Sequence, residues 1–438
     1  MAFLRGVYHY LLAWLGAALY DFPSRRIFVL GVTGTKGKSS TLELINAVLE
    51  FNGQRTAVLS SLRVKIADRD QPNRTDNTMP GRFFIQKFLQ QAVQAGCRYA
   101  LIEVTSEGVA QYRHRFINFD AALFLNIHPE HIERHGSFEK YLAAKIRFFR
   151  DAARHSSKRH KLFIINEQSA KRGDFERVAS QNGRLVYFSG QIFEKRLAEG
   201  KKFPNYWLAS DFNLENAAAA ASFAETQEIS WPVIRSALLV FKGVPGRLEF
   251  VQNQPFRVVI DYAHTPDSLI KVYENLHSAK RPGPSAANNR RLAISDKRFA
   301  VKLICVLGAA GGGRDKWKRP EFGRIAGRYC REIILTNEDP YDENPEQILR
   351  EIEAGILPTA NPAKLRNAAG NQHQTTINVF KILDRQAAIN KAVSLAKKGD
   401  TVIITGKGSE HWMHLARGAR IIWSERRAVQ EAIGLLRK

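Results

Sequence analysis

The chain has 438 residues, of which 44% are hydrophobic and 25% charged, a composition typical of a soluble globular protein with two or three domains. Lysine and arginine give it a formal net charge of +24 at pH 7. These basic residues are scattered and no nucleic-acid-binding module is recognisable, so we predict no dedicated nucleic-acid binding. A generally solvated basic surface, or a positive field that attracts polyanionic ligands such as nucleotides, would explain the charge instead.

The three cysteines, Cys97, Cys305 and Cys330, lie far apart in the sequence and form no Cys-x-x-Cys pair. An odd and sparse set of this kind predicts a reducing compartment. It argues against both a disulfide framework and a zinc site.

An apolar run of eleven residues, Tyr10 to Tyr20, lies close to the N-terminus. It is shorter than the roughly 20 residues that a membrane-spanning helix needs, and no signal-peptide cleavage site is clearly placed after it. Two interpretations stay open: a helix that packs on the first domain, or a helix at a membrane surface formed by residues 3–20, with Trp14 at the boundary. We expect a cytoplasmic protein, peripheral at the membrane in the second case.

Short apolar runs alternate with helical patterns along the first half of the chain. The strand-like runs are Ile27 to Leu30, Tyr99 to Val104, Ala121 to Asn126 and Leu162 to Ile165, and a helical spacing extends over Ser40 to Phe51. Continuous apolar strands between helices predict an α/β fold with a mostly parallel sheet covered on both faces.

A second α/β set follows the alanine-rich helical stretch Asn216 to Ala224 and the turn-rich joint Gly243 to Arg247. We therefore predict an N-terminal helix and linker (1–26), a central domain (27–240) and a Rossmann-like C-terminal domain (241–438). The expected strands of the last domain are Val258 to Asp261, Val301 to Leu307, Glu332 to Thr336 and Thr401 to Thr405. The basic, polar stretches Ser278 to Lys297 and Asn361 to Thr376 are expected to be surface insertions or partly mobile loops.

A glycine-rich loop, Gly34-Thr35-Lys36-Gly37-Lys38-Ser39-Ser40, joins the first strand to the first helix. Its glycines allow backbone N–H groups to face phosphate oxygens, and the helix N-terminus favours the same anions. Lys38 is placed to neutralise phosphates and Ser39 to hold Mg²⁺. The strict Walker spacing fails at Val32, so this is a shorter variant of the phosphate-binding loop.

Other polar groups follow the ends of expected strands. Glu103 ends one strand, where a Mg²⁺ ligand is needed beside a phosphate loop, and His131 follows the next. Lys145 falls in a helical stretch and, by pattern alone, is an ordinary solvated lysine. In the C-terminal domain Asp261, Glu338 and Gly406 also follow strands, and ligands of open parallel sheets bind at these carboxyl ends.

Taken together, the motifs resemble those of the Mur ligase superfamily, and most closely its UDP-N-acetylmuramoyl-tripeptide synthetases, from about Tyr20 to Glu425. The motifs that carry the resemblance are TGTKGKSS (33–40), NTMP (77–80), EVTSEG (103–108), LNIHPEHIERHGSFEKYLAAK (125–145), FNLENAAAA (212–220), GVPGRLE (243–249), DYAHTPD (261–267), GGGRDKWKRP (311–320) and GKGSE (406–410).

The resemblance implies ATP and Mg²⁺ as cofactors and assigns roles by position. The expected ATP-binding residues are Gly34, Thr35, Lys36, Gly37, Lys38, Ser39, Ser40, Asn216 (near the base), Arg247 and Asp261. The expected metal ligands are Ser39, Glu103, His131 and Lys145, the last in carbamoylated form, and Lys38, Lys145, His131 and Glu103 are the expected catalytic residues. The expected substrate-binding residues are Asn77, Thr78, Thr105, Ser106, Arg113, Glu338, Asp339, Tyr341, Gly406 and Glu410.

The implied reaction forms an amide bond. A substrate carboxylate attacks the γ-phosphate of ATP, and the amine of an amino acid then displaces phosphate from the acyl phosphate. Bound cations would reduce the repulsion between the two anions in the first step. The implied partners are a nucleotide, an amino acid and an anionic carboxylate substrate, which is a UDP-MurNAc-peptide or a related cell-wall precursor, and we expect a monomer.

Three departures from the family pattern concern the substrates. Only about 25 residues precede the first strand of the central domain, whereas family members begin with a UDP-binding domain of about 100 residues. The carboxylate substrate is therefore expected to be held differently. The Asp-Asn-Pro-Arg selector of diaminopimelate-adding members reads Glu338-Asp339-Pro340-Tyr341 here, which favours a basic or small amino acid such as lysine. The histidines of two further motifs are replaced by Glu107 and Ser409.

Two other classes of function remain as alternatives. One is a ligase of the folylpolyglutamate synthetase type, or one that acts on a lipid-linked or polymeric acceptor. The other is a non-catalytic nucleotide-binding protein, which the presence of Glu103, His131 and Lys145 disfavours.

Overall fold

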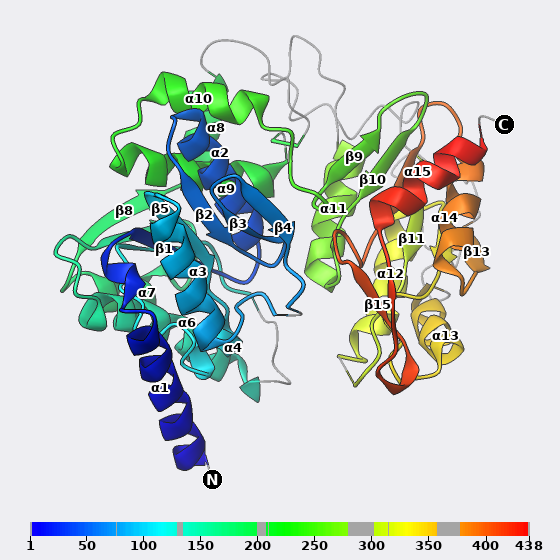
Figure 1. Cartoon of the computed structure of the whole chain (residues 1–438). Coiled ribbons are helices and arrows are strands. Elements are labelled where there is room, and N and C mark those ends of the chain that lie inside the picture. Colours follow the sequence, from blue (N-terminus) through cyan, green and yellow to red (C-terminus); the bar gives the residue numbers. More distant parts are fainter. Residues whose placement is uncertain are drawn as a thin grey trace. The chain divides into compact units, whose positions relative to one another are not determined.

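The computed structural model describes residues 2–75, 77–128, 135–198, 207–208, 210–278, 302–313, 315–356 and 377–436. The chain divides into two compact units, Met1–Lys242 and Gly243–Lys438, which are described separately (Figure 1). The expected surface stretch at 361–376 lies outside the described residues, and so does the one at 278–297 apart from the backbone of Ser278.

The first unit contains a sheet with strand order β4-β3-β2-β5-β1-β6-β7-β8. Its strands are β1 (Phe28–Thr33), β2 (Thr56–Leu59), β3 (Arg63–Ile66), β4 (Arg69–Pro72), β5 (Tyr99–Glu103), β6 (Ala121–Phe124), β7 (Leu162–Asn166) and β8 (Arg184–Phe188). Six neighbouring strands, from β2 to β8 in that order, are parallel, and β3 pairs with β2 and β4 in antiparallel fashion. The expected mostly parallel sheet is confirmed.

Helices cover both faces of this sheet (Figure 1). They are α2 (Lys38–Phe51), α3 (Arg82–Gln94), α4 (Ser106–Ala110), α6 (Phe138–His155), α7 (Arg172–Ala179), α8 (Gly190–Ala198), α9 (Asp211–Thr226) and α10 (Trp231–Val240). On one face α2 packs with α9 and α10. On the other, apolar side chains of α3, α6 and α7 share one core with the sheet. Burial on both sides explains why β5 reads as a continuous apolar run.

Helix α1 (Ala2–Leu19) precedes the sheet, followed by the short 3-10 helix η1 (Pro23–Arg25). It docks on α3 through the small residues Ala13 and Ala17, which are buried, and Gly16, where an added Cβ would lie 3.6 Å from the Phe83 side chain. Tyr10 makes edge contacts with Tyr112 and Phe116. In the described part of the chain, no helix is both long and apolar enough to cross a membrane.

The second unit contains a six-stranded sheet of order β13-β12-β11-β14-β10-β9, parallel except for β9. Its strands are β9 (Glu249–Gln252), β10 (Arg257–Ile260), β11 (Leu303–Leu307), β12 (Glu332–Leu335), β13 (Asn378–Lys381) and β14 (Thr401–Ile404). A separate antiparallel pair consists of β15 (Trp412–His414) and β16 (Arg420–Ile422), which are connected by the short 3-10 helix η5 (Ala416–Gly418). Helices α14 (Arg385–Ser394) and α15 (Glu425–Leu435) share the core on one face. Helices α11 (Pro266–Ser278), α12 (Lys318–Tyr329) and α13 (Pro345–Ile356) pack together on the other.

The expectation that this chain has no disulfide is wrong, because Cys305 and Cys330 are bonded and only Cys97 is a free thiol. Cys305 lies in β11 and Cys330 directly follows α12. The chain there returns to the neighbouring strand β12, which brings the two Cα atoms 6.0 Å apart. Sequence spacing alone gives no sign of this approach.

Candidate functional site

The phosphate-binding loop occupies the turn between β1 and α2. Gly37, the residue before the helix, has φ +84°, and a Cβ at this position would lie 2.2 Å from Asn216 Oδ1. Only glycine fits both requirements. The Lys36 backbone N–H donates a 3.0 Å hydrogen bond to Asn126 Oδ1, which ties the loop to the end of β6.

Lys38 folds back over the loop that precedes it. Its Nζ donates hydrogen bonds to the carbonyl oxygens of Gly34 (3.1 Å) and Thr35 (3.0 Å) and lies 3.8 Å from Glu103 Oε1. Its side chain is 15% exposed. The ammonium group therefore lies against the backbone of the loop and stays partly accessible to solvent.

Glu103, at the end of β5, is joined to the first turn of α2. Ser39 Oγ donates a 2.8 Å hydrogen bond to Glu103 Oε2, and the backbone N–H of Ser61, after β2, donates a 3.0 Å bond to the same oxygen. The hydroxyl and the carboxylate are both hard oxygen ligands, close enough to share one ion. Mg²⁺ commonly takes one or two protein oxygens and completes its shell with phosphate and water.

No group of three or more His, Cys, Asp or Glu side chains that could hold a metal occurs among the described residues. The pair formed by Ser39 and Glu103 offers two oxygen ligands, which fits a Mg²⁺ ion that also coordinates phosphate. His131, the expected ligand of a second ion, lies outside the described residues.

Lys145 is not the solvated lysine that its pattern suggested, because it is 2% exposed. From α6 its Nζ donates a 2.7 Å hydrogen bond to the Gly34 carbonyl oxygen and lies 4.7 Å from the centre of the Tyr141 ring. The Tyr141 hydroxyl is 3.0 Å from Thr35 Oγ1. Lys145 and Tyr141 therefore support the phosphate loop from the side opposite to Lys38's helix. Tyr141 was missed as a site residue, although it stands four positions before Lys145.

Asn216 lies beneath the loop. It is 5% exposed, and its Oδ1 accepts a 3.2 Å hydrogen bond from Thr41 Oγ1. Ser40, beside Ser39, is also buried. In this structure Asn216 contacts the polypeptide around Gly37, and a contact with the nucleotide base stays a prediction.

The expected substrate residues of the first unit cluster around α4. Thr105 caps this helix by accepting a 3.1 Å hydrogen bond from the Gly108 N–H. Ser106 Oγ lies 3.0 Å from Nε2 of His135, which the sequence pattern did not single out. Arg113 donates to the Met79 carbonyl oxygen and so joins α4 to the segment that contains Asn77 and Thr78. Asn77 itself lies in an exposed turn and Thr78 is partly buried.

In the second unit, Asp261 and Arg247 lie around the end of β10. Asp261 accepts hydrogen bonds from the N–H groups of Leu248 (2.6 Å) and Ala263 (2.7 Å). The Arg247 guanidinium lies 4.0 Å from the centre of the Tyr262 ring. Both residues are expected to bind ATP, and contacts within the second unit fix their positions. Tyr262, which Arg247 contacts, also belongs to the ion network around Lys407.

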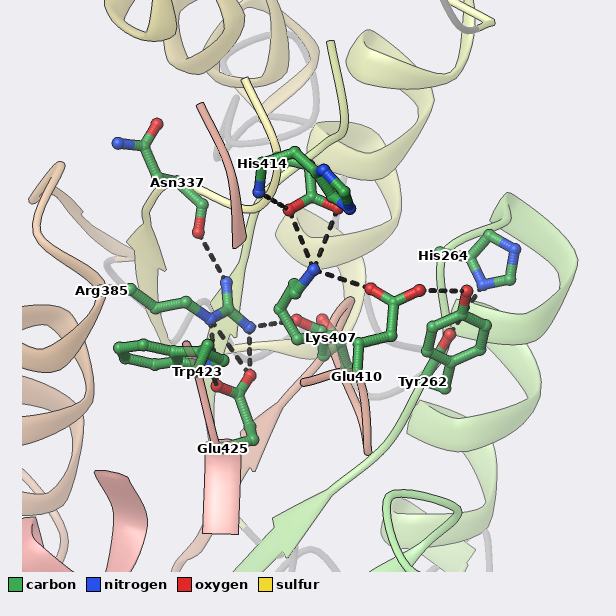
Figure 2. A network of polar contacts seen from close by, with 11 residues as sticks. Tyr262, His264, Asn337, Arg385, Lys407, Glu410, His414, Trp423 and Glu425 are labelled. Carbon is green, nitrogen blue, oxygen red and sulfur yellow. Dashed lines mark hydrogen bonds and ion pairs between the residues drawn. The ribbon is translucent and has the colours of Figure 1, made fainter. Parts of the chain in front are cut away.

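Lys407 is the centre of a buried ion network (Figure 2). Its Nζ, fully buried, lies 2.9 Å from both carboxylate oxygens of Asp339 and 2.7 Å from Glu410 Oε2. Burial disfavours the ammonium charge, but Glu410 and Asp339 outweigh this and raise the pKa of Lys407. Glu410 also accepts a 2.8 Å hydrogen bond from the Tyr262 hydroxyl. Lys407 and Tyr262 stood within recognised motifs but were not selected as site residues.

Glu338, next to Asp339, lies against Gly406, where φ is +105° and a Cβ would be 2.3 Å from Glu338 Oε2. Burial raises the pKa of Glu338 to about 7, against the opposing effect of Arg385 and Lys407. This side chain can therefore change its charge near neutral pH.

Arg385, which had no sequence signal, forms a second buried ion pair in the same region. Its Nε lies 3.1 Å from each carboxylate oxygen of Glu425, and its Nη groups donate 2.8 Å bonds to the carbonyl oxygens of Asn337 and Thr405 (Figure 2). It thereby ties the end of β12 to the end of β14.

Tyr341, at the position of the selector arginine, has φ +51° and stacks on His414 of β15 with ring centres 5.1 Å apart. The His414 N–H donates a 2.8 Å hydrogen bond to Asp339. The structure thus brings Glu338, Asp339, Tyr341, Gly406 and Glu410 to one edge of the second sheet.

Comparison with known proteins gives two family matches. The Mur ligase middle domain matches residues 32–224, and the Mur ligase glutamate ligase domain matches residues 284–408. The UDP-N-acetylmuramoyl-L-alanyl-D-glutamate--2,6-diaminopimelate ligase of Geobacillus kaustophilus (strain HTA426) is 30% identical over 439 residues, which cover 96% of this chain and 81% of the relative.

Solved structures agree with these matches. A structure of a UDP-N-acetylmuramoyl-L-alanyl-D-glutamate--2,6-diaminopimelate ligase aligns with a TM-score of 0.56 and 25% identity, and covers 94% of this chain and 79% of that one. The Mycobacterium tuberculosis folylpolyglutamate synthase complexed with ADP and AMPPCP aligns with a TM-score of 0.60 over 93% of this chain and 96% of that one. At 14% identity the latter match shows a shared fold alone.

Proposed function

This chain belongs to the Mur ligase family and is an ATP-dependent ligase that joins a substrate carboxylate to an amino acid; we propose how it does so and on which substrates. The proposed carboxylate substrate is a UDP-MurNAc-peptide, by analogy with the substrate named in its relatives. The observation that carries the proposal is the convergence of Lys38, Ser39 and Glu103 at the carboxyl ends of β1 and β5.

In the proposed first step, the substrate carboxylate attacks the γ-phosphate of ATP held on the loop from Gly34 to Ser40. Lys38 Nζ, which donates to the Gly34 and Thr35 carbonyl oxygens of the loop, would exchange these contacts for phosphate oxygens. Ser39 and Glu103 would hold Mg²⁺, which supplies positive charge between the two reacting anions. ADP leaves and the carboxylate carries the phosphoryl group as an acyl phosphate.

We propose that Lys145 acts as a carbamate. Unmodified, its ammonium group is buried against the Gly34 carbonyl and lies over the Tyr141 ring. The ammonium group first loses a proton; addition of CO₂ to the neutral Nζ then releases a second proton and gives an anionic group at the base of the loop. Such a group could hold a second cation together with His131. Asn216 is proposed to reach the nucleotide base, and Arg247 and Asp261 are proposed to bind ATP.

The amino acid acceptor is proposed to be basic, with lysine as the leading candidate. The support is the acidic character of this edge: the carboxylates of Asp339 and Glu410 outnumber the buried ammonium group of Lys407, and Glu338 adds negative charge as pH rises through about 7. An amino acid with a cationic side chain complements this edge, and Tyr341 offers a ring where a diaminopimelate ligase has an arginine. The amine of this acceptor would attack the acyl phosphate and release phosphate.

A donor and acceptor matrix tests the proposal. Phosphate release is measured for the purified chain with ATP and Mg²⁺, over UDP-MurNAc-dipeptide and a pterin carboxylate as donors, and over the twenty amino acids and diaminopimelate as acceptors. We expect release only when the UDP-MurNAc-peptide and lysine are both present. Release that depends on the pterin carboxylate and glutamate would replace this assignment with the folylpolyglutamate alternative, which the shared fold permits.

We further propose that the enzyme works as a monomer in the cytoplasm, where its nucleotide substrates occur. Sedimentation of the purified chain as a dimer would contradict the monomer.

A further inference from the structure

Helix α1 carries a solvent-exposed face that is apolar from Val7 to Leu19. Six large exposed side chains lie on this face: Val7 (41%), Tyr8 (60%), Leu11 (57%), Trp14 (50%), Leu15 (49%) and Leu19 (65%). At 100° per residue they occupy a continuous arc of about 140°, on the opposite side from the docking residues Ala13 and Ala17. We call these six residues the α1 arc.

The α1 arc reverses the usual pattern of a surface helix, whose outer face is polar or charged. From Gly6 to Leu19 the helix has no Asp, Glu, Lys or Arg. It projects from the first unit with its N-terminal end farthest from the sheet (Figure 1). Contiguous exposed apolar surface of this kind marks a site of interaction with a protein or a membrane.

The charges near α1 favour a membrane over a protein as the partner of the α1 arc. Exposed Arg25 and Arg26 follow the helix within two turns, against a single acidic residue, Asp21, and the chain carries a net charge of +24. This charge attracts an anionic surface. The arc also lacks the polar side chains that fix the register of a protein partner, apart from the Tyr8 hydroxyl and the Trp14 indole N–H.

Tryptophan and tyrosine favour the boundary between acyl chains and headgroups, where one edge of the ring is apolar and the other is hydrated. Leu11 and Leu15 lie between Trp14 and Tyr8 on the arc, as a helix buried to a shallow depth requires. We propose that the α1 arc binds the surface of an anionic lipid bilayer and holds the first unit there, with α1 parallel to the membrane plane. This proposal does not depend on the identity of the ligase substrates.

Vesicle binding by the full chain tests this interaction. Sedimentation is measured with phosphatidylcholine vesicles with and without phosphatidylglycerol, for the wild type and for L11E/L15E. We expect binding to the anionic vesicles that weakens with salt, and a loss of about tenfold or more in partitioning for L11E/L15E. The matched control is V240E/I422E, which adds the same charge at apolar positions that are 63% and 80% exposed outside α1, and should bind as the wild type does.

A second measurement avoids any effect of charge on folding. Brominated lipids should quench part of the wild-type tryptophan fluorescence, and W14F should lose that part while still binding vesicles. The proposal is overturned if the wild type does not bind anionic vesicles, if L11E/L15E and V240E/I422E bind equally well, or if ultracentrifugation without lipid shows a dimer that L11E/L15E abolishes.

Discussion

Ser39 Oγ and Glu103 Oε2, 64 residues apart in sequence, are joined by a 2.8 Å hydrogen bond at the carboxyl ends of neighbouring strands. The bond places a hydroxyl and a carboxylate beside the loop that is proposed to bind the phosphates of ATP. It also fixes the carboxylate within 3.8 Å of Lys38 Nζ, so that one residue balances the lysine charge before the nucleotide binds.

Replacement of this carboxylate should affect catalysis far more than folding. Glu103→Gln keeps the shape and one oxygen acceptor but removes the charge that attracts Mg²⁺. We expect amide formation to fall about 100-fold or more, with a higher Mg²⁺ concentration for half-maximal rate, in a phosphate-release assay titrated with the metal. Glu225→Gln at the end of α9 is the control, and equal rates for the two variants would contradict the metal role of Glu103.

The modification proposed for Lys145 makes activity depend on dissolved CO₂. Enzyme dialysed against CO₂-free buffer should lose rate and recover it when bicarbonate is added. Lys145→Gln should be inactive in both conditions, while Lys140→Gln, on the exposed face of the same helix, should respond as the wild type does. A wild-type rate that is insensitive to bicarbonate, together with an intact-mass spectrum that lacks the carbamate, would exclude the modification.

Sequence reasoning succeeded where local chemistry determines structure. The glycines from Gly34 to Gly37, preceded by an apolar strand, require the turn that the structure shows. Strands of only four residues with polar sequence, such as β4 (Arg69–Pro72), carry no periodic signal and were missed. Lys145 entered the site only through the family resemblance, because its burial depends on how α6 packs on the loop.

Long-range charge pairs lay beyond sequence reasoning for the same reason. Lys407 and Asp339 are 68 residues apart, and Arg385 meets Glu425 across 40 residues. No fixed spacing in the sequence predicts either pair, because each pair depends on which strands are neighbours in the sheet.

Because Lys407 is fully buried between two carboxylates, its removal should be costly to stability. Lys407→Met leaves Asp339 without its cation in a buried setting, and we expect a loss of about 3–5 kcal/mol in the unfolding free energy. Lys381→Met breaks an exposed pair with Glu353 and should cost about 0–1 kcal/mol. The two variants are compared by calorimetry of the full chain. Equal melting temperatures would contradict the prediction that the buried ion pair of Lys407 matters more to stability than the exposed pair of Lys381.

Glu338 should make stability depend on pH in a defined direction. Its pKa in the folded chain is about 7, against 4.5 for the ordinary carboxyl. Below pH 4.5 the group is protonated in both states, so its favourable contribution is fully present. Between pH 4.5 and 7 the unfolded state ionises while the folded state keeps its proton, so this contribution is lost progressively. Above pH 7 the loss is complete, at about 3 kcal/mol for a pKa difference of that size.

Glu338→Gln mimics the neutral acid at every pH. We therefore expect the variant to match the wild type near pH 5 and to be more stable near pH 8, measured as the difference in unfolding temperature of the transition that belongs to the second unit. Glu346→Gln, whose carboxylate is 64% exposed on α13, should show no such divergence. A Glu338→Gln difference that is the same at both pH values would mean that Glu338 is ionised throughout, held by the positive charges of Arg385 and Lys407 against the effect of burial.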